Sequence, residues 1–209
     1  MGHIKDTMIT APTLNDLAFK YRSDKGTIQF SPTTWMHCYT RLYDEIFSPR
    51  RDQKLNILDI GAVGENHGGS SMMLAEYFPN AQIYSIDLNP EVMTLESDRI
   101  KAQVVNLDNE MDTIVKLSSW NVPFDIVVED ASHQPKQQMR TLVNLHPLLA
   151  NGFQYIIEDV CDNHEILHAV EGGSQLPHMS VFEWFCLRSK CTNMQVVKTN
   201  GVSKLVYLT

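Results

Sequence analysis

Acidic side chains follow two short apolar segments of the sequence, at the point where each predicted strand ends. Segment 124–128 leads into Asp130, and segment 154–157 leads into Glu158 and Asp159. If the two strands are neighbours in a parallel sheet, their ends lie about 4.8 Å apart and the carboxylates converge. Clustered carboxylates repel one another without a cation, and oxygen ligands favour Mg²⁺, Mn²⁺ or Ca²⁺ over zinc. The alternative is that these acids cap the helices that follow.

A histidine accompanies the first of these acids. His133 lies three residues after Asp130, in the same predicted loop. A divalent cation lowers the pKa of a hydroxyl that it coordinates, and a histidine near its ordinary pKa can take the proton. Ion and base together predict chemistry at a substrate hydroxyl. His164 and His168 share a helix face, but no third ligand is near in sequence, so we interpret them as surface or packing residues.

A strand-turn-helix-strand pattern occupies residues 56–90. The first apolar run, 57–60, is followed by a glycine-containing turn from Gly61, a helical stretch from Ser70, and a second apolar run that ends in Asp87. Glycines let the backbone approach a ligand closely, and an acid after the second strand can accept hydrogen bonds from ribose hydroxyls. The pattern predicts a cofactor that contains a nucleoside. The alternative is a turn whose glycines serve only tight packing.

The glycine turn carries neither G-x-G-x-x-G nor G-x-x-x-x-G-K-[ST], so a dinucleotide or phosphate cradle is not supported. Asp59 adds a negative charge near the turn, which would repel a pyrophosphate and suits a cationic sulfonium. S-adenosylmethionine fits, because it joins adenosine to an amino acid without phosphate. Asp108 lies where an adenine amino group could be read, with a solvated loop acid as the alternative. Our candidates for cofactor contacts are Gly61, Ser70, Asp87, Asp108 and Ser132.

Predicted strands alternate with predicted helices along the chain, which indicates a doubly wound, Rossmann-like α/β sheet. The chain then carries two β-rich runs, 194–198 and 204–208, on either side of Asn200-Gly201. Asn-Gly is a strong hairpin signal, so we expect an antiparallel hairpin at the C-terminal edge of the sheet.

Two predicted helices, 13–21 and 34–47, precede the first strand and can cover the carboxyl edge of the sheet. We interpret most of their residues as packing residues. The polar turn 23–27 between them is the exception, because it could reach the ligand. The predicted organisation is an N-terminal helical cover, residues 1–50, and a methyltransferase-like domain, residues 51–209.

Composition excludes several classes of partner. The chain has 209 residues and a net charge of −8, and its 17 basic residues form no cluster that would bind nucleic acid or an anionic membrane. No apolar run reaches the ~20 residues that a membrane span needs, and the N-terminus lacks the apolar core of a secretory signal. The four cysteines form no C-x-x-C pair, which favours free thiols and a cytoplasmic location.

Five motifs together resemble the macrocin-type sugar O-methyltransferases. These are class I S-adenosylmethionine-dependent enzymes, and the group includes mycinamicin methyltransferases and cephalosporin-hydroxylase-like proteins. The resemblance covers the region of residues 14–160. The motifs read KYRSDKGT at 20–27, HCYTRLY at 37–43, LDIG at 58–61, DASH at 130–133 and IED at 157–159.

The resemblance implies three Mg²⁺ ligands, namely Asp130, Glu158 and Asp159. It also implies His133 as the general base, Asp87 as the ribose contact, and Gly61 beneath the methionine part of the cofactor. In the family the ion chelates two neighbouring substrate oxygens, typically a sugar diol. The loop 129–133 reads EDASH where the family usually has DDGSH, so the ligand and base positions are kept.

We therefore predict a Mg²⁺-dependent O-methyltransferase, with Mn²⁺ as an alternative ion, that methylates a hydroxyl of a sugar or sugar-bearing natural product. Alternatives are a polyketide-like or carrier-bound acceptor, a nucleotide-dependent oxidoreductase, and a non-catalytic cofactor-binding partner subunit. The expected partner is a small-molecule hydroxyl acceptor, with no nucleic acid and no membrane. Assembly into a homo-oligomer is left open.

Overall fold

The computed structural model describes residues 11–64, 67–160, 194–198 and 204–209. Within them, seven strands form one sheet in the order β3-β2-β1-β4-β5-β7-β6. The strands are β1 Asn56–Ile60, β2 Gln82–Asp87, β3 Ile100–Val104, β4 Phe124–Glu129, β5 Leu149–Ile157, β6 Met194–Lys198 and β7 Lys204–Leu208.

Strands β1 to β5 pair in parallel, and β7 pairs antiparallel with both β5 and β6. The predicted α/β class with a C-terminal antiparallel pair is therefore confirmed. The predicted Asn200-Gly201 turn lies outside the described residues, and so do His164 and His168.

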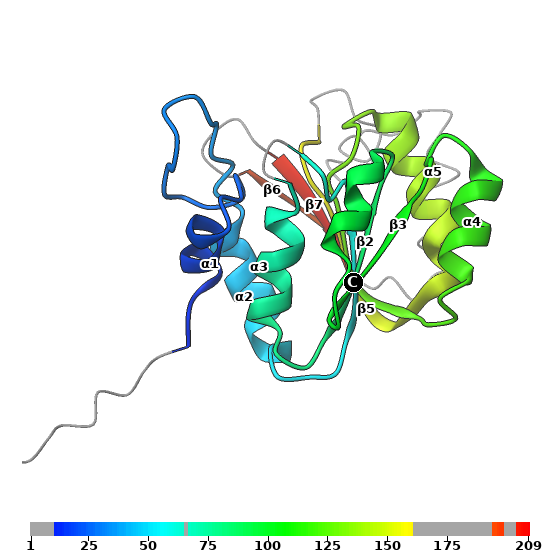
Figure 1. Ribbon diagram of the computed structural model, residues 1–209, viewed down its shortest axis with the longest axis horizontal. Coiled ribbons are helices and arrows are strands. Elements are labelled where there is room, and N and C mark those ends of the chain that lie inside the picture. The colour runs from blue at the N-terminus through cyan, green and yellow to red at the C-terminus, as the bar shows by residue number, and fades with distance from the viewer. Residues whose placement is uncertain (1–10, 65–66, 161–193, 199–203) are drawn as a thin grey trace, which may run out of the picture.

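Helices cover both faces of the sheet (Figure 1). One face carries α1 Leu14–Lys20, α2 Thr40–Phe47 and α3 Gly69–Tyr77, and the other carries α4 Glu110–Ser118 and α5 Pro135–Leu145. Short 3₁₀ turns are η1 Ser48–Arg50, η2 Pro90–Leu95 and η3 His146–Leu148.

Alternate residues of the central strands supply the two cores. Ile57 and Ile83 pack with α1, α2 and α3, whereas their neighbours Leu58 and Tyr84 pack toward α4 and α5. All four side chains are buried. Because both faces are covered, the parallel strands read as nearly continuous apolar runs.

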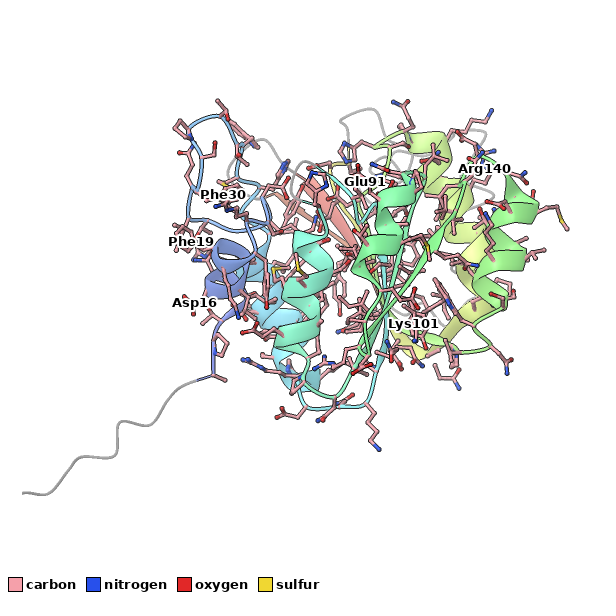
Figure 2. All side chains as sticks on the ribbon, in the orientation of Figure 1. Asp16, Phe19, Phe30, Glu91, Lys101 and Arg140 are labelled. Atoms are coloured by element: carbon pink, nitrogen blue, oxygen red, sulfur yellow. The ribbon has the colours of Figure 1, made fainter. Side chains whose placement is uncertain are left out.

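The first helix agrees with its sequence pattern. A capping box joins the N-cap Thr13 to Asp16, and Leu14, Leu17 and Ala18 are buried. Phe19 lies on the outer side of α1 and is 48% exposed (Figure 2). The buried stripe of α1 packs beside α3, so the N-terminal segment lies over the same core as β1.

The second helix begins at Thr40 instead of the predicted residue 34. Residues 34–39 form no helix because Cys38 has a φ of 61° and the segment bonds to the preceding turn. The His37 amide donates to the Asp24 carbonyl at 2.8 Å, and the Thr40 amide donates to the Lys25 carbonyl at 3.0 Å. These hydrogen bonds between two segments of the chain take the place of the first predicted helical turns, and they fix the polar turn 23–27 against the start of α2.

Two other boundaries differ from expectation. Apolar residues at helical spacing also predict a helix over 137–149 that is ended by Gly152. The observed helix is α5, which begins at Pro135, ends at Leu145 and continues into η3. Gly152 does not end this helix, since it lies inside β5 with a φ of 69°. Apart from these shifts, each predicted strand has its counterpart. None of the described helices is long and apolar enough to cross a membrane.

Candidate active site

Neighbouring strand ends bring the predicted acids together. β4 and β5 pair in parallel with Glu129 opposite Ile157, so Asp130 and Glu158 emerge side by side. The Asp130 amide donates to the Ile60 carbonyl at 2.9 Å, and the Glu158 amide donates to the Glu129 carbonyl at 2.9 Å. These backbone bonds extend the sheet pairing by one residue and fix where both acidic side chains begin.

One group of side chains in the described part of the chain has the spacing of a metal site. It consists of Asp130, His133 and Asp159, whose ligand atoms all lie within 4.8 Å of one another. His133 Nε2 lies 2.9 Å from Asp130 Oδ1 and 3.7 Å from Asp159 Oδ2. Two partly exposed carboxylates facing one imidazole fit a hard divalent cation. Sequence patterns had placed Asp130 and Asp159 here as ligands and His133 as the base.

Glu158, the third predicted ligand, is 1% exposed and has other partners in the structure. Lys25 Nζ donates to Glu158 Oε2 at 2.5 Å, and the Tyr43 hydroxyl donates to Glu158 Oε1. Lys25 Nζ also lies 2.5 Å from Asp130 Oδ2. Lys25 therefore links Glu158 to the group formed by Asp130, His133 and Asp159. The role of Glu158 as a ligand stays a prediction.

Lys25 was missed as an individual residue by the sequence patterns. The available signal was its place in the polar turn 23–27, which we expected to reach a ligand. Burial alone would lower the pKa of Lys25, but the charges of Asp130 and Glu158 outweigh it and raise the pKa. Lys25 therefore stays protonated between the two acids.

Aromatic residues around α2 hold the other acid. The Tyr39 hydroxyl donates to Asp159 Oδ1 at 2.5 Å, and His37 Nδ1 lies 3.0 Å from the same oxygen. Burial, followed by the charges of Glu158 and Asp159, raises the pKa of Tyr39. Its hydroxyl consequently remains a donor at neutral pH. The roles of His37 and Tyr39 carry no signal of their own in the sequence beyond the matched motif.

The ionisation states follow from these contacts. Burial would raise the pKa of Asp130, but Lys25 and His133 outweigh it and the pKa falls well below its ordinary value. Burial would also raise the pKa of Asp159, and His37 and Tyr39 outweigh it in the same way. Both carboxylates are thus charged near neutral pH and available to a cation.

Unusual backbone conformations cluster at this site. His133 has a φ of 55° and Asp159 a φ of 49°, in the left-handed region that L-residues seldom occupy. Such conformations cost on the order of 1–3 kcal/mol each and persist at functional sites where surrounding structure enforces them. At both positions the strained backbone carries a side chain of the spaced group.

A cavity of about 290 Å³ opens beside the acids, at the carboxyl ends of β1, β2 and β4. Four of the five predicted cofactor contacts line it, namely Gly61, Asp87, Asp108 and Ser132. Ser70 instead lines an adjoining hollow, together with Ser23, Gly61 and Asp130. The cavity and the adjoining hollow share Gly61 and Asp130. A ligand that spans both would therefore pass the three acids Asp130, Glu158 and Asp159, which we call the acid cluster.

Only glycine fits at position 61, between the cavity and the adjoining hollow. It has a φ of 83°, and a Cβ atom at this position would lie 2.0 Å from the Asp130 carbonyl oxygen. Any side chain here would therefore displace the loop that carries Asp130. The glycine lets β1 and β4 end close together, with the cavity directly above them.

The predicted polar contacts are held in place by the protein. Asp87 Oδ2 accepts a hydrogen bond from the Val63 amide at 2.8 Å, which fixes the glycine turn. Asp108, on the opposite wall, accepts from Gln137 Nε2 at 3.0 Å, and Arg140 Nη2 lies 3.4 Å from the same carboxylate oxygen. Figure 2 shows Arg140 on α5. Both acids are thus preorganised, and their contacts to a cofactor stay predictions.

Asp59 lies beneath the cavity rather than in its lining. It is 1% exposed, and the hydroxyls of Ser70 and Ser71 donate to its Oδ2 at 2.7 and 2.5 Å. Burial raises the pKa of Asp59, although the two serines oppose the shift. In the structure this acid ties the end of β1 to the first turn of α3. That the charge of Asp59 favours a cationic cofactor over a pyrophosphate stays a prediction.

Glu129, the last residue of β4, is a buried acid with one hydrogen-bond partner. The Tyr155 hydroxyl donates to Glu129 Oε2 at 2.9 Å, and no described atom pairs with Oε1. Burial raises the pKa of Glu129 to about 8, and the bond from Tyr155 opposes this only in part.

We expect Glu129→Gln to stabilise the protein above neutral pH. The folded protein keeps Glu129 protonated up to about pH 8, whereas the unfolded chain ionises near the ordinary value of 4.5. Wild-type stability therefore falls as the pH rises through this window. Glutamine keeps the shape and the acceptor without ionising, so the gain should reach at least about 1 kcal/mol at the upper end and vanish below the window. Urea unfolding of both proteins below pH 4.5 and near pH 8 measures the difference in the free energy of unfolding. A difference that does not change with pH would contradict the prediction.

Comparison with known proteins finds relatives that are named methyltransferases. No family model matches the chain. It is 32% identical over 164 residues to the 8-demethyl-8-(2-methoxy-alpha-L-rhamnosyl)-tetracenomycin-C 3'-O-methyltransferase of Streptomyces olivaceus, covering 74% of this chain and 40% of that enzyme. It is 30% identical to the mycinamicin VI 2''-O-methyltransferase of Micromonospora griseorubida, covering 71% and 36%. It is 31% identical to the demethylmacrocin O-methyltransferase of Streptomyces fradiae, also covering 71% and 36%.

The chain spans 36–40% of the length of these curated relatives. Solved structures agree in fold. The MycE methyltransferase, solved with Mg, SAH and mycinamycin VI, has a TM-score of 0.69 at 22% identity, covering 94% of this chain and 54% of that chain. A second solved structure, from Nostoc punctiforme, has a TM-score of 0.53 at 14% identity, covering 83% of this chain and 56% of that chain. These likenesses confirm the class I methyltransferase fold.

Proposed function

Because the chain is a relative of the macrocin- and mycinamicin-type sugar O-methyltransferases, we propose that it transfers a methyl group from S-adenosylmethionine to a hydroxyl of a glycosylated small molecule, with the help of Mg²⁺. The observation that carries the proposal is the convergence of Asp130, His133 and Asp159 beside the cavity. By name, the relatives act on a rhamnosyl tetracenomycin, on mycinamicin VI and on demethylmacrocin, which supports a sugar-bearing acceptor.

The cavity of about 290 Å³ would hold the nucleoside of the cofactor. In this proposal Asp87 accepts hydrogen bonds from the ribose and Asp108 from the adenine amino group. The glycine at 61 lets the methionine part lie against the backbone, toward the hollow that Ser70 and Ser23 line. The sulfonium methyl group would then face the acid cluster.

Asp130 and Asp159, with Glu158 as the predicted third ligand, would hold the ion. When bound, Mg²⁺ lowers the pKa of the acceptor hydroxyl and helps to orient it. His133 accepts the proton, and the neighbouring carboxylates, at 2.9 and 3.7 Å, stabilise the imidazolium that results. The hydrogen bond from His133 to Asp130 raises the pKa of the imidazole, despite its partial burial. The deprotonated acceptor oxygen would attack the sulfonium methyl carbon in line as the carbon–sulfur bond breaks, and S-adenosylhomocysteine would leave as the neutral thioether.

We expect S-adenosylhomocysteine to raise the melting temperature of the protein and NAD to leave it unchanged. A ligand at one hundred times its dissociation constant stabilises by about 2.7 kcal/mol, enough for a clear shift. The effect should shrink in Asp87→Asn and persist in Asp98→Asn, whose side chain is exposed. A shift by NAD alone would favour the oxidoreductase alternative.

Turnover decides between an enzyme and a non-catalytic binding subunit. The informative assay follows methyl transfer to a rhamnosylated polyketide and to its aglycone, with Mg²⁺ and with EDTA. Methylation that needs both the sugar and the ion supports the proposal, and methylation of the aglycone alone supports the polyketide-like acceptor. Cofactor binding without transfer to any glycosylated acceptor would favour the non-catalytic alternative.

Three further predictions complete the proposal. The division into a helical cover, residues 1–50, and a methyltransferase domain, residues 51–209, is one. A cytoplasmic location, based on the cysteine pattern of the sequence, is the second. Assembly into a homo-oligomer is the third, and it is open to measurement by light scattering.

A further inference from the structure

A lysine from the N-terminal segment lies inside the acid cluster. The Lys25 side chain is 4% exposed, and its Nζ atom lies 2.5 Å from both Asp130 Oδ2 and Glu158 Oε2. A lysine buried to this extent is found almost only with charged partners. Asp130 thus turns one oxygen toward Lys25 and the other, Oδ1, toward His133 on the open side.

The fold holds this lysine in place. The Lys25 carbonyl accepts a hydrogen bond from the Thr40 amide at 3.0 Å, and the neighbouring Asp24 and Gly26 carbonyls accept from the amides of His37 and Cys38. The turn therefore pairs with the segment before α2 on three successive residues. Lys25 reaches the acids from a backbone that cannot shift without breaking these bonds.

The position of Lys25 sets the charge of the site. Lys25 adds one positive charge to a group of three acids, and its Nζ atom lies 2.5 Å from two of them, Asp130 and Glu158. Without Lys25, the charged Asp130 would lie beside a second buried acid with no cation between them.

We propose that Lys25 is a positioning residue that acts as a built-in counter-ion: it holds Asp130 and Glu158 together in the metal-free protein and weakens divalent-ion binding to the cluster. The inference rests on the proposed function, since it takes the cluster to be the ion site. Two effects of Lys25 both weaken divalent-ion binding. Lys25 stabilises the metal-free acids, and its charge repels an incoming cation.

The variants Lys25→Met and Lys25→Gln test the proposal. Both remove the charge, and glutamine keeps a hydrogen-bond donor if methionine prevents folding. Lys25→Arg keeps the charge. Lys20→Met is the matched control, because Lys20 forms an exposed ion pair with Glu76 at the surface. The measurements are the Mn²⁺ dissociation constant, from the electron paramagnetic resonance signal of free Mn²⁺, and the melting temperature with and without Mn²⁺.

We expect the neutral variants to bind Mn²⁺ at least about tenfold more tightly than the wild type. They should melt at a lower temperature than the wild type in EDTA, and saturating Mn²⁺ should remove most of this difference. Lys25→Arg and Lys20→Met should keep the wild-type dissociation constant within about threefold, since neither changes the charge of the cluster.

An unchanged or weaker Mn²⁺ affinity in both neutral variants, with the wild type binding normally, would overturn the role of Lys25 alone. A different result would overturn the proposed function. If the wild type and Asp130→Asn both fail to bind Mn²⁺ in the presence of S-adenosylhomocysteine, the cluster is not an ion site. The two failures are therefore distinguishable in one set of titrations.

Discussion

His133→Ala should lose on the order of 10²–10⁴-fold in turnover, while its affinity for S-adenosylhomocysteine stays at the wild-type value. The imidazole is the proposed proton acceptor, and alanine offers none. The side chain is not among those that line the cofactor cavity, so binding should be spared. Single-turnover methyl transfer and calorimetric titration of the cofactor product measure the two quantities.

The matched control for this variant is His146→Ala, because His146 begins η3 at the opposite end of the sheet. The pH profile adds a second readout. The imidazole must be neutral to accept a proton, and its pKa is raised, so wild-type turnover should climb as the pH passes upward through a value above 6.5. The variant should lack this limb. A retained limb with near-normal turnover would exclude His133 as the base.

Asp130→Asn should reduce turnover by at least about 100-fold and should make the residual rate insensitive to EDTA. Asparagine keeps the size of the side chain and removes the charge that faces both His133 and Lys25. Because Asp130 belongs to the spaced group and touches both neighbours, we expect its loss to affect ion binding and base orientation together.

Wild-type turnover in EDTA is the reference for this variant, and Asp98→Asn is the control for a change of one negative charge at the surface. Added Mg²⁺ should restore the treated wild type and leave Asp130→Asn unchanged. Wild-type turnover that persists after thorough removal of divalent ions would contradict the metal half of the proposal.

The parallel strands were predictable because strands buried on both faces of a sheet carry a strong apolar signal. Asp130, Glu158 and Asp159 were placed at one edge for the same reason, since each follows such a strand. The Cys38 conformation was not predictable, because a left-handed non-glycine residue is stabilised here by bonds to a turn twelve or more positions earlier. Residues 34–39 therefore form no helix despite their helical periodicity, because hydrogen bonds to the turn 23–27 hold them in another conformation.

The contacts of Lys25 also escaped the sequence. Its partners lie 105 and 133 positions away, and nothing local distinguishes a buried lysine from a solvated one in a polar turn. The same holds for Tyr39 and Tyr43, whose helical spacing indicates packing and whose hydroxyls nonetheless contact Asp159 and Glu158. Roles that depend on the far end of a long side chain need the folded structure.

Anomalous scattering from crystals grown with Mn²⁺ and S-adenosylhomocysteine tests the central claim most directly. We predict a single strong Mn²⁺ peak at coordination distance from the carboxylates of Asp130 and Asp159, with the sulfur of the cofactor product facing it from the cavity. A peak elsewhere, or none at saturating Mn²⁺ with the cofactor product bound, would show that these acids do not gather around an ion and that methyl transfer here needs another explanation.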